Sequence, residues 1–321
     1  MLRISMNAWL AVMLTAASIS AAVGQNYPYK PIRMLSGEAE SGGDITGRLI
    51  GQKMASSLGQ PMIMDNRGGS IVIPTMMMVK AAPDGYTVLL YAGSVWLLPF
   101  LQDGVPYDPV RDFSPITLAS SSPNVVVVNP LVEARSIREL IALAKAKPGG
   151  LNYSSSTIGS SSHLAGALFN SMAGVNIQNI PYKGSGPAAV ALVGGEVQVM
   201  FSNTGVVTPH LKAGRVRALA VTSAQPSALL PDLPTVAASG LPGYEVATIF
   251  GIFAPAKTPS AIINKLNQEM VRALRMSDVK EKLLSVGIDA IGSSPAELAS
   301  TMKADMARMG TVIKTLGIRA N

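Results

Sequence analysis

The chain alternates short apolar runs with stretches of helical periodicity. The apolar runs predict strands at residues 31–35, 62–64, 87–91, 122–128, 177–181, 197–201, 216–221 and 248–254. Apolar side chains three or four positions apart predict helices at residues 44–58, from about 74, and at 137–147, 164–172, 188–193, 262–274 and 298–316. Such alternation is typical of an α/β fold rather than of an all-β protein or a helical bundle.

Several predicted strands end in loops that carry glycine and a polar residue. The first of these loops, residues 36–44, ends at Asp44, which we expect to cap the next helix. In open α/β sheets, ligands bind beyond the carboxyl ends of the strands. Candidate ligand contacts at these strand ends are Gly42, Gly43, Asp44, Ser94, Asn203 and Thr204.

A serine-rich stretch, residues 154–162, separates a predicted strand from the helix that begins near Leu164. Serine and threonine accept hydrogen bonds from the first N–H groups of a helix, and its positive pole attracts anions. A flexible linker is the alternative, but the helix that follows directly favours a ligand loop. A similar loop precedes residues 188–193, where Pro187 suits the first helical position. Candidate contacts in the two loops are Ser155, Ser156, Thr157, Ser161, Ser185 and Gly186.

The first 24 residues have the pattern of a cleavable signal peptide. Arg3 precedes an apolar run, and small residues at Ala22 and Gly24 suit cleavage before Gln25. The run is about 16 residues, shorter than the roughly 20 that span a bilayer, although an uncleaved anchor is the alternative. We therefore expect export, and the absence of cysteine from an exported chain favours a bacterial periplasm.

Composition excludes several kinds of chemistry. The chain has no cysteine and two histidines, so we expect no thiolate or histidine-based metal centre, and nothing in the sequence calls for a cofactor. The formal charge is +7, or one less without Arg3, but the basic residues are dispersed and aromatic residues make up only 5%. We therefore expect no nucleic-acid surface, which requires a basic stripe and stacking aromatic side chains.

A set of short phrases lies in order along the mature chain. In the first half they are residues 27–33 (YPYKPIR), 58–61 (LGQP), 65–67 (DNR), 82–86 (APDGY), 105–109 (VPYDP) and 151–154 (LNYS). In the second half they are residues 159–163 (GSSSH), 181–187 (PYKGSGP), 217–221 (RALAV), 233–236 (LPTV), 240–244 (GLPGY) and 254–259 (APAKTP). Each phrase is weakly specific, but in this order they resemble the Bug-type substrate-binding receptors of the tripartite tricarboxylate transporters.

The resemblance implies a type II periplasmic-binding-protein fold, in which two α/β lobes are joined by two crossover strands and enclose a ligand cleft. The crossovers are expected near residues 125–128 and 246–250. The first lobe would comprise residues 25–124 and 248–321, and the second residues 125–247. The resemblance also implies capture of a small organic acid or related polar metabolite for delivery to integral membrane transporter subunits, and we expect a monomer.

The first loop departs from the family pattern. The commoner sequence there is Pro-Phe-Pro followed by small residues, whereas this chain has Glu38 and Glu40. If either glutamate faces the cleft, it would repel a dicarboxylate unless Lys183 or Arg67 lies nearby. An amide, an aromatic acid or a neutral metabolite would then be favoured as the ligand. The alternative is that both glutamates point into solvent.

Two other functional classes remain open at this level. An exported hydrolase would need a nucleophile with its base, but no Gly-x-Ser-x-Gly elbow stands between a strand and a helix, so we expect no catalytic residue. A periplasmic sensor for a membrane signalling partner would use the same cleft as a transport receptor. The sequence does not separate sensing from transport.

Overall fold

The computed structural model describes residues 27–37, 39, 41–156, 159–227 and 230–319. Three predictions concern residues outside this part of the chain. They are the signal peptide at residues 1–24, the orientation of Glu38 and Glu40, and the ligand contact at Thr157.

The described part of the chain alternates strands and helices as the sequence predicts. The strands are β1 (Ile32–Ser36), β2 (Met62–Asn66), β3 (Thr87–Ala92), β4 (Phe113–Val128), β5 (Asn152–Ser155), β6 (Gln178–Pro181), β7 (Val199–Asn203), β8 (Arg217–Val221), β9 (Ala247–Pro255) and β10 (Asp289–Ala290). The helices are α2 (Gly42–Leu58), α3 (Val72–Val79), α4 (Ser94–Leu101), α5 (Pro109–Asp112), α6 (Ile137–Ala146), α7 (Ser161–Ala173), α8 (Ser185–Gly194), α9 (Thr204–Lys212), α10 (Ser260–Arg275), α11 (Ser277–Ser285) and α12 (Pro295–Thr315).

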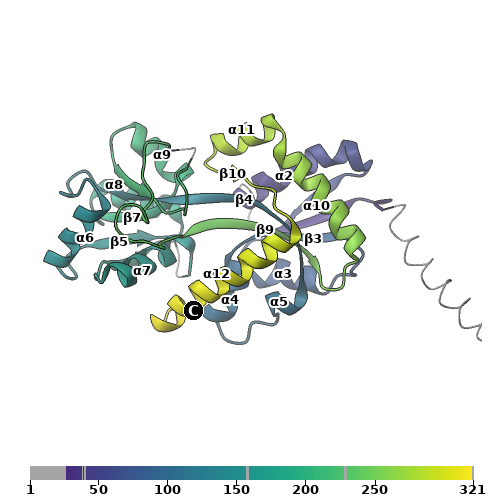
Figure 1. Ribbon diagram of the computed structural model, residues 1–321, viewed down its shortest axis with the longest axis horizontal. Helices are drawn as coiled ribbons and strands as arrows, with labels where there is room; N and C mark the ends of the chain where they lie inside the picture. The colour runs from purple at the N-terminus through teal and green to yellow at the C-terminus, as the bar shows by residue number, and fades with distance from the viewer. Residues whose placement is uncertain (1–26, 38, 40, 157–158, 228–229, 320–321) are drawn as a thin grey trace, which may run out of the picture.

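Two α/β lobes share one continuous sheet, with strand order β2-β1-β3-β9-β4-β7-β5-β6. Strands β1, β2 and β3 pair in parallel on one side, and β5, β6 and β7 pair in parallel on the other. The antiparallel strands β4 and β9 connect the two groups, and Figure 1 shows both running between the lobes. This is the predicted two-lobed fold with crossover strands.

Strand β4 changes partners along its 16 residues. Up to Pro123, which pairs with Ala247, it lies beside β9. From Asn124, which pairs with Asn203, it lies between β7 and β8. The sequence pattern predicted only the end of this strand, because the earlier part contains buried hydroxyl side chains. Thr117, for example, donates a hydrogen bond of 2.8 Å to the carbonyl of Ser293.

Apolar side chains fill the interior of each lobe. In the first lobe they lie between the first strands and α10, with Met34, Val88 and Leu266 fully buried. In the second lobe Phe169 and Phe201 pack with ring centroids 5.5 Å apart under α7. Helix α12 extends from the first lobe toward the second, where it contacts α7 (Figure 1). The two lobes therefore contact each other through this helix.

Several helix starts differ from the predictions. Helix α2 is capped by the hydroxyl of Ser41, which accepts the N–H of Asp44, so the prediction that Asp44 is the cap is wrong. Helix α8 begins at Ser185, which makes Pro187 its third residue rather than its first. Helices also begin directly at Ser94 and Thr204, where the sequence had indicated only strand ends.

Candidate functional site

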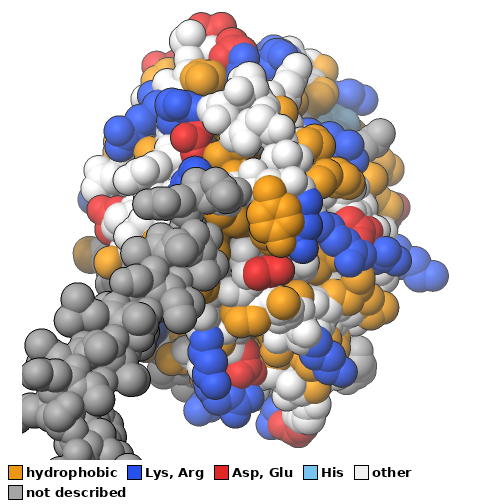
Figure 2. Space-filling view, turned by 90° about the vertical axis from the view of Figure 1, so that its right-hand side faces the viewer, with side chains coloured by type: hydrophobic (Ala, Val, Ile, Leu, Met, Phe, Trp, Pro, Cys, Tyr) orange, Lys and Arg blue, Asp and Glu red, His pale blue; other side chains and the backbone are white. Residues whose placement is uncertain are grey.

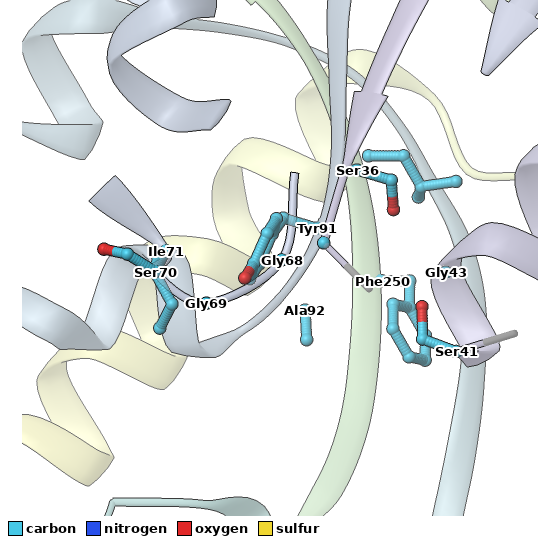
Figure 3. A pocket seen from close by; sticks show the side chains of 12 residues that line it. Ser36, Ser41, Gly43, Gly68, Gly69, Ser70, Ile71, Tyr91, Ala92 and Phe250 are labelled. Carbon is cyan, nitrogen blue, oxygen red and sulfur yellow. The ribbon is translucent and has the colours of Figure 1, made fainter. Parts of the chain in front are cut away.

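Two adjoining cavities lie along the carboxyl ends of the first-lobe strands. The first, here called the pole cavity, has a volume of about 410 Å³. Its described lining residues are Ser36, Gly37, Ser41, Gly43, Gly68, Gly69, Ser70, Ile71, Leu90, Tyr91, Ala92 and Phe250. Figure 3 shows Ser41 and Gly43 at one side of this cavity and Gly69, Ser70 and Ile71 at the other, with Tyr91 and Ala92 between them.

The pole cavity receives the positive end of α2. In an α-helix the first N–H groups have no acceptor within the helix. The hydroxyl of Ser41 accepts one of them, from Asp44, which leaves Gly42 and Gly43 with N–H groups that have no intrahelical acceptor. A Cβ atom on Gly42 would stand 3.0 Å from Phe250 Cζ, so glycine allows the backbone to pack against this ring. The arrangement offers backbone donors to an anion without using a cation.

The second cavity, here called the leucine chamber, has a volume of about 380 Å³ and shares Ile71, Tyr91 and Ala92 with the pole cavity. Its other described lining residues are Gly93, Ser94, Leu97, Leu98, Leu101, Gly159, Ser160, Ser161, Leu164, Asn203, Val246, Ala247, Thr248, Asp305 and Met309. They come from α4, α7, α12, the end of β7 and the start of β9. The chamber therefore lies between the two lobes.

Hydrogen bonds connect β9 to the second lobe at the wall of the leucine chamber. The hydroxyl of Thr248 donates to Ser161 Oγ at 2.9 Å, and Thr248 Oγ1 accepts from the amide of Asn203 at 3.5 Å. The same amide donates to Ser122 Oγ on β4 at 3.4 Å. A change in the angle between the lobes would act directly on these bonds.

The serine-rich stretch reaches the first lobe at Gly159. Gly159 has a φ of +78°, and a Cβ atom there would stand 2.8 Å from Leu101 Cδ1, so only glycine allows this close approach. The N–H of Gly159 donates to Nδ1 of His163 at 2.9 Å. Burial lowers the pKa of His163, so the imidazole is neutral and acts as an acceptor. His163 therefore holds Gly159 in place through this hydrogen bond.

Asp305 on α12 lines the leucine chamber beside Gly93, where a Cβ atom would stand 3.6 Å from Asp305 Oδ2. Its carboxylate accepts the indole N–H of Trp96 at 2.8 Å and a guanidinium N–H of Arg308 at 3.3 Å. Burial raises the pKa of Asp305, and the bonds from Trp96 and Arg308 partly offset that effect. Arg308 also pairs with Glu245 at 2.8 Å, so one cation serves two carboxylates.

Charged side chains are scarce at this site. Among the described residues that line the two cavities, Asp305 is the only charged one. On the face of the molecule shown in Figure 2, basic and acidic side chains are interspersed rather than gathered into a single patch. Within the described ranges, no group of histidine and carboxylate side chains could hold a metal ion, and no helix is both long and apolar enough to cross a membrane.

The structure brings four of the predicted ligand contacts to the cavities. Gly43 lines the pole cavity, and Ser94, Ser161 and Asn203 line the leucine chamber. Each of the four is the first or second residue of a helix or the last residue of a strand. This agrees with the expectation that such residues lie near the ligand site. Whether they contact a ligand stays a prediction.

The other predicted contacts have structural environments of their own. Asp44 is buried, and its carboxylate accepts from Arg48 Nε and Asn66 Nδ2, each at 3.0 Å. Thr204 is also buried and donates to the carbonyl of Pro123 at 3.1 Å. The remaining ones, Gly42, Ser155, Ser156, Ser185 and Gly186, are not among the described residues lining either cavity.

Ser155 and Ser156 lie at the end of β5. Ser155 is fully buried, and its hydroxyl has no hydrogen-bond partner among the described residues. The N–H of Ser156 donates to Ser162 Oγ at 3.1 Å and so shapes the serine-rich stretch. Ser185 and Gly186 begin α8. Ligand contact at these positions stays a prediction.

The sequence reasoning missed most of the cavity wall. Ser36, Ser41 and Ser70 stand in the strand-end loops that the pattern identified, and the adjacent pair Gly68 and Gly69 is the signal that could have selected the loop after β2. The apolar wall of the leucine chamber carries no local signal. Its leucines look like ordinary core positions until α4, α7 and α12 are placed together.

Comparison with known proteins agrees with this architecture. A family profile described as "Tripartite tricarboxylate transporter family receptor" matches residues 46–318. A Pseudomonas sp. (strain P51) protein named for the tcbD-tcbE intergenic region is 37% identical over 98% of this chain and 94% of its own length. Protein BugT of Bordetella pertussis is 34% identical over 97% of each chain.

Solved structures show the same fold. R. palustris Rpa4515, solved with adipate, is 34% identical, covers 91% of this chain and 99% of its own, and has a TM-score of 0.78. The periplasmic binding protein BugD is 30% identical, covers 92% of this chain and 100% of its own, and has a TM-score of 0.75. These relatives are solute-binding receptors rather than enzymes, so the exported-hydrolase alternative is rejected. The chain belongs to the tripartite tricarboxylate transporter receptor family, whose members are periplasmic solute-binding proteins.

Proposed function

We propose that this receptor holds the carboxylate of a small organic acid in the pole cavity, against the N-terminus of α2. The observation that carries the proposal is the composition of that cavity. A helix-pole glycine and three serines line it, and its described lining contains no carboxylate that would repel an anion. Because charge-assisted hydrogen bonds are strong, such a site can hold an acid without an arginine.

Specific donors can be assigned to that carboxylate. The N–H groups of Gly42 and Gly43 have no acceptor within α2. Gly43 lines the pole cavity and Gly42 directly precedes it, so we assign both N–H groups to the ligand. Ser36, at the end of β1, offers a hydroxyl on one side of the cavity, and Ser70, in the loop between β2 and α3, lies on the other side. These donors are fixed by the backbone and need little reorganisation on binding, which favours affinity.

The solved relatives support an acid as the ligand. Rpa4515 was solved with adipate, and MatC from Rhodopseudomonas palustris, 29% identical with a TM-score of 0.74, was solved with bound malate. MatC covers 89% of this chain and 100% of its own. Both ligands carry carboxylates, and the pole cavity offers the donors that a carboxylate requires.

We further propose that the two lobes comprise residues 25–124 with 248–321, and residues 125–247. The change of partners along β4, between Pro123 and Asn124, supports a boundary there. Ligand bridging the lobes would favour a closed arrangement, because only that arrangement allows contacts from both sides. The second-lobe residues Ser161 and Asn203, at the wall of the leucine chamber, would supply such contacts.

The proposed route is export followed by delivery. We propose that residues 1–24 are removed near Gln25, that the mature protein works in the periplasm as a monomer, and that it delivers its ligand to integral membrane transporter subunits. Determination of the N-terminal sequence of the mature protein tests the cleavage. Capture of the membrane partner by the ligand-loaded receptor separates transport from sensing, since a signalling kinase in place of transporter subunits would contradict the transport role.

Calorimetric titration with adipate, malate, hexanoate and an aromatic acid tests the ligand class. We expect at least one acid to bind, to raise the melting temperature and to reduce the radius of gyration in X-ray scattering. Mass spectrometry of the natively purified protein would then identify any acid that copurifies. If none of the four acids binds and no acid copurifies, the proposal is wrong.

A further inference from the structure

The leucine chamber has an apolar wall that the pole cavity lacks. The wall is formed by Leu97, Leu98 and Leu101 from α4, Leu164 from α7 and Met309 from α12. Each of these side chains is at most 6% exposed, so the wall is fixed by packing on its outer side. Because Ile71, Tyr91 and Ala92 line both cavities, the two adjoin, and we infer that a ligand anchored in the first cavity can extend into the second.

The chamber wall beside Gly93 has an acidic character, since a Cβ atom at Gly93 would stand 3.6 Å from Asp305 Oδ2. Asp305 lines it, and its neighbour Arg308 is also paired with Glu245. One positive charge therefore stands against two negative ones, and the cluster carries a net negative charge. A ligand carboxylate placed there would meet repulsion in a partly buried environment, where charges interact more strongly than in water.

The polar wall of the chamber does not compensate for this charge. The hydroxyls of Thr248 and Ser161 are bonded to each other at 2.9 Å. Ser160 Oγ accepts the N–H of His163 at 3.3 Å, as the cap of α7. Among the described lining residues of the chamber no lysine or arginine is present. The wall can therefore accommodate a neutral polar substituent but offers no cation to a second acid.

Building on the proposed function, we propose that the ligand is a monocarboxylate with an apolar body, either an aliphatic chain or an aromatic ring. Its carboxylate lies in the pole cavity, and its body lies against Leu97, Leu101 and Met309. Dicarboxylates of the same length are disfavoured, because their second carboxylate would enter a chamber whose described lining carries the carboxylate of Asp305 and no lysine or arginine.

The apolar wall leads to a quantitative expectation for how affinity depends on the chain length of the acid. Each methylene that leaves water contributes enough to raise affinity about fourfold. From butanoate through pentanoate to hexanoate, we therefore expect the dissociation constant to fall about fourfold at each step until the chamber is filled. A pocket that recognised the carboxylate alone would give the same constant for all three acids.

Matched acid pairs provide the decisive test. Hexanoate ends in a methyl group where adipate has a second carboxylate. In the same way, 4-methylbenzoate has a methyl group where terephthalate has a second carboxylate. We expect the monoacid of at least one pair to bind about tenfold tighter or more, measured by calorimetric titration of the full mature chain. If the diacid binds equally well or tighter in both pairs, the inference is wrong while the proposed organic-acid function stands. If no acid binds, both fail.

A substitution at Met309 tests the location. Met309→Lys places a cation at the chamber wall and should shift the ratio of adipate to hexanoate affinity toward adipate by about tenfold. Met309→Leu keeps the wall apolar and should leave the ratio unchanged. Circular dichroism and melting temperature establish that both variants are folded, and if Met309→Lys does not fold, Leu97→Lys serves in its place. An unchanged ratio in a folded lysine variant would contradict the chamber as the site of the ligand's body.

Discussion

The hydroxyl of Thr248 donates a hydrogen bond of 2.9 Å to Ser161, and so joins the crossover strand β9 to the first residue of α7. Thr248 also accepts from the amide of Asn203, at the end of β7. All three residues line the leucine chamber. Ligand contact at this wall and the relative position of the lobes are therefore linked through one side chain.

Replacing Thr248 with valine should weaken ligand binding. Thr248→Val keeps the shape of the side chain but removes both the donor to Ser161 and the acceptor for Asn203. Because an internal hydrogen bond contributes about 1 kcal/mol, we expect affinity for the best organic acid to fall about fivefold. Thr248→Ser retains the hydroxyl and is the control. Equal affinity of the valine and serine variants, measured by calorimetry, would rule out a role for these bonds.

A bulky residue at the start of α7 should block the chamber. Ser161→Phe places a ring where the side chain faces the cavity, so we expect no measurable binding although the melting temperature of the free protein changes little. Ser161→Ala removes only the hydroxyl and should bind more weakly than the natural protein. If Ser161→Phe binds as tightly as the natural protein, the second lobe does not contribute to the site.

A leucine at Gly43 should remove the pole cavity as a carboxylate site. A Cβ atom at Gly43 would stand 3.4 Å from Phe250 and from Ser36 Oγ, which both line the cavity, so the larger leucine side chain should displace the ligand from the two backbone donors at the start of α2. The loss of two charge-assisted hydrogen bonds of about 1.5 kcal/mol each corresponds to about a 100-fold weaker affinity. Calorimetry with the best organic acid measures the change.

Gly194 offers a matched control for that substitution. It is also a helical glycine, it lies exposed at the end of α8, and a Cβ atom added there would extend into open space. Gly194→Leu should therefore leave affinity unchanged. If both leucine variants bind equally well, the carboxylate does not lie at the start of α2.

The free energy of unfolding should decrease when the solution is acidified. Burial holds the pKa of His163 below its ordinary value of about 6.5, so the folded protein keeps this imidazole neutral while the unfolded chain protonates it. Stability is therefore present above about pH 6.5 and is lost as the pH falls toward the folded-state pKa. Urea unfolding near pH 7 and near pH 5.5 measures the slope, which His163→Asn should reduce. An identical slope in that variant would exclude His163 as the cause.

Loss of the indole donor to Asp305 should destabilise the fold. Trp96→Phe leaves a largely buried carboxylate with one partner fewer, and we expect a cost of about 1–3 kcal/mol in the free energy of unfolding. If the hydrogen bond is responsible, the effects of Trp96→Phe and Asp305→Asn should not add in the double variant. Full additivity in urea unfolding would show that the two residues act independently.

The sequence predicted the alternation of strands and helices well because apolar periodicity is local. It also identified the loops after β1, β2 and β3, since glycine together with polar residues directly after an apolar run is a local signal for the end of a strand. It failed at Asp44, because the choice between two neighbouring capping residues depends on where the chain enters the helix. Ser41 takes that role, and Asp44 instead joins Arg48 and Asn66.

The apolar part of the site could not be predicted from local pattern. Leu101 and Met309 have the spacing of core residues, and nothing in their neighbourhoods along the chain distinguishes them from residues packed inside a lobe. They become part of a cavity only because α4 and α12 meet α7 from the other lobe. Gly159, in contrast, stands in the serine-rich stretch that the sequence pattern had singled out. The structure shows why glycine is required there, since its φ is positive and its backbone closely approaches Leu101.

Comparison of acids with their own amides tests the central claim most directly. Hexanoate and hexanamide, and adipate and adipamide, have nearly the same shape, but only the acids carry the negative charge that the N-terminus of α2 should bind. We expect at least one acid to bind, with a dissociation constant about tenfold or more below that of its amide, by calorimetric titration near neutral pH. Equal binding of acid and amide in both pairs, or no binding of either acid, would contradict recognition of a carboxylate in the pole cavity.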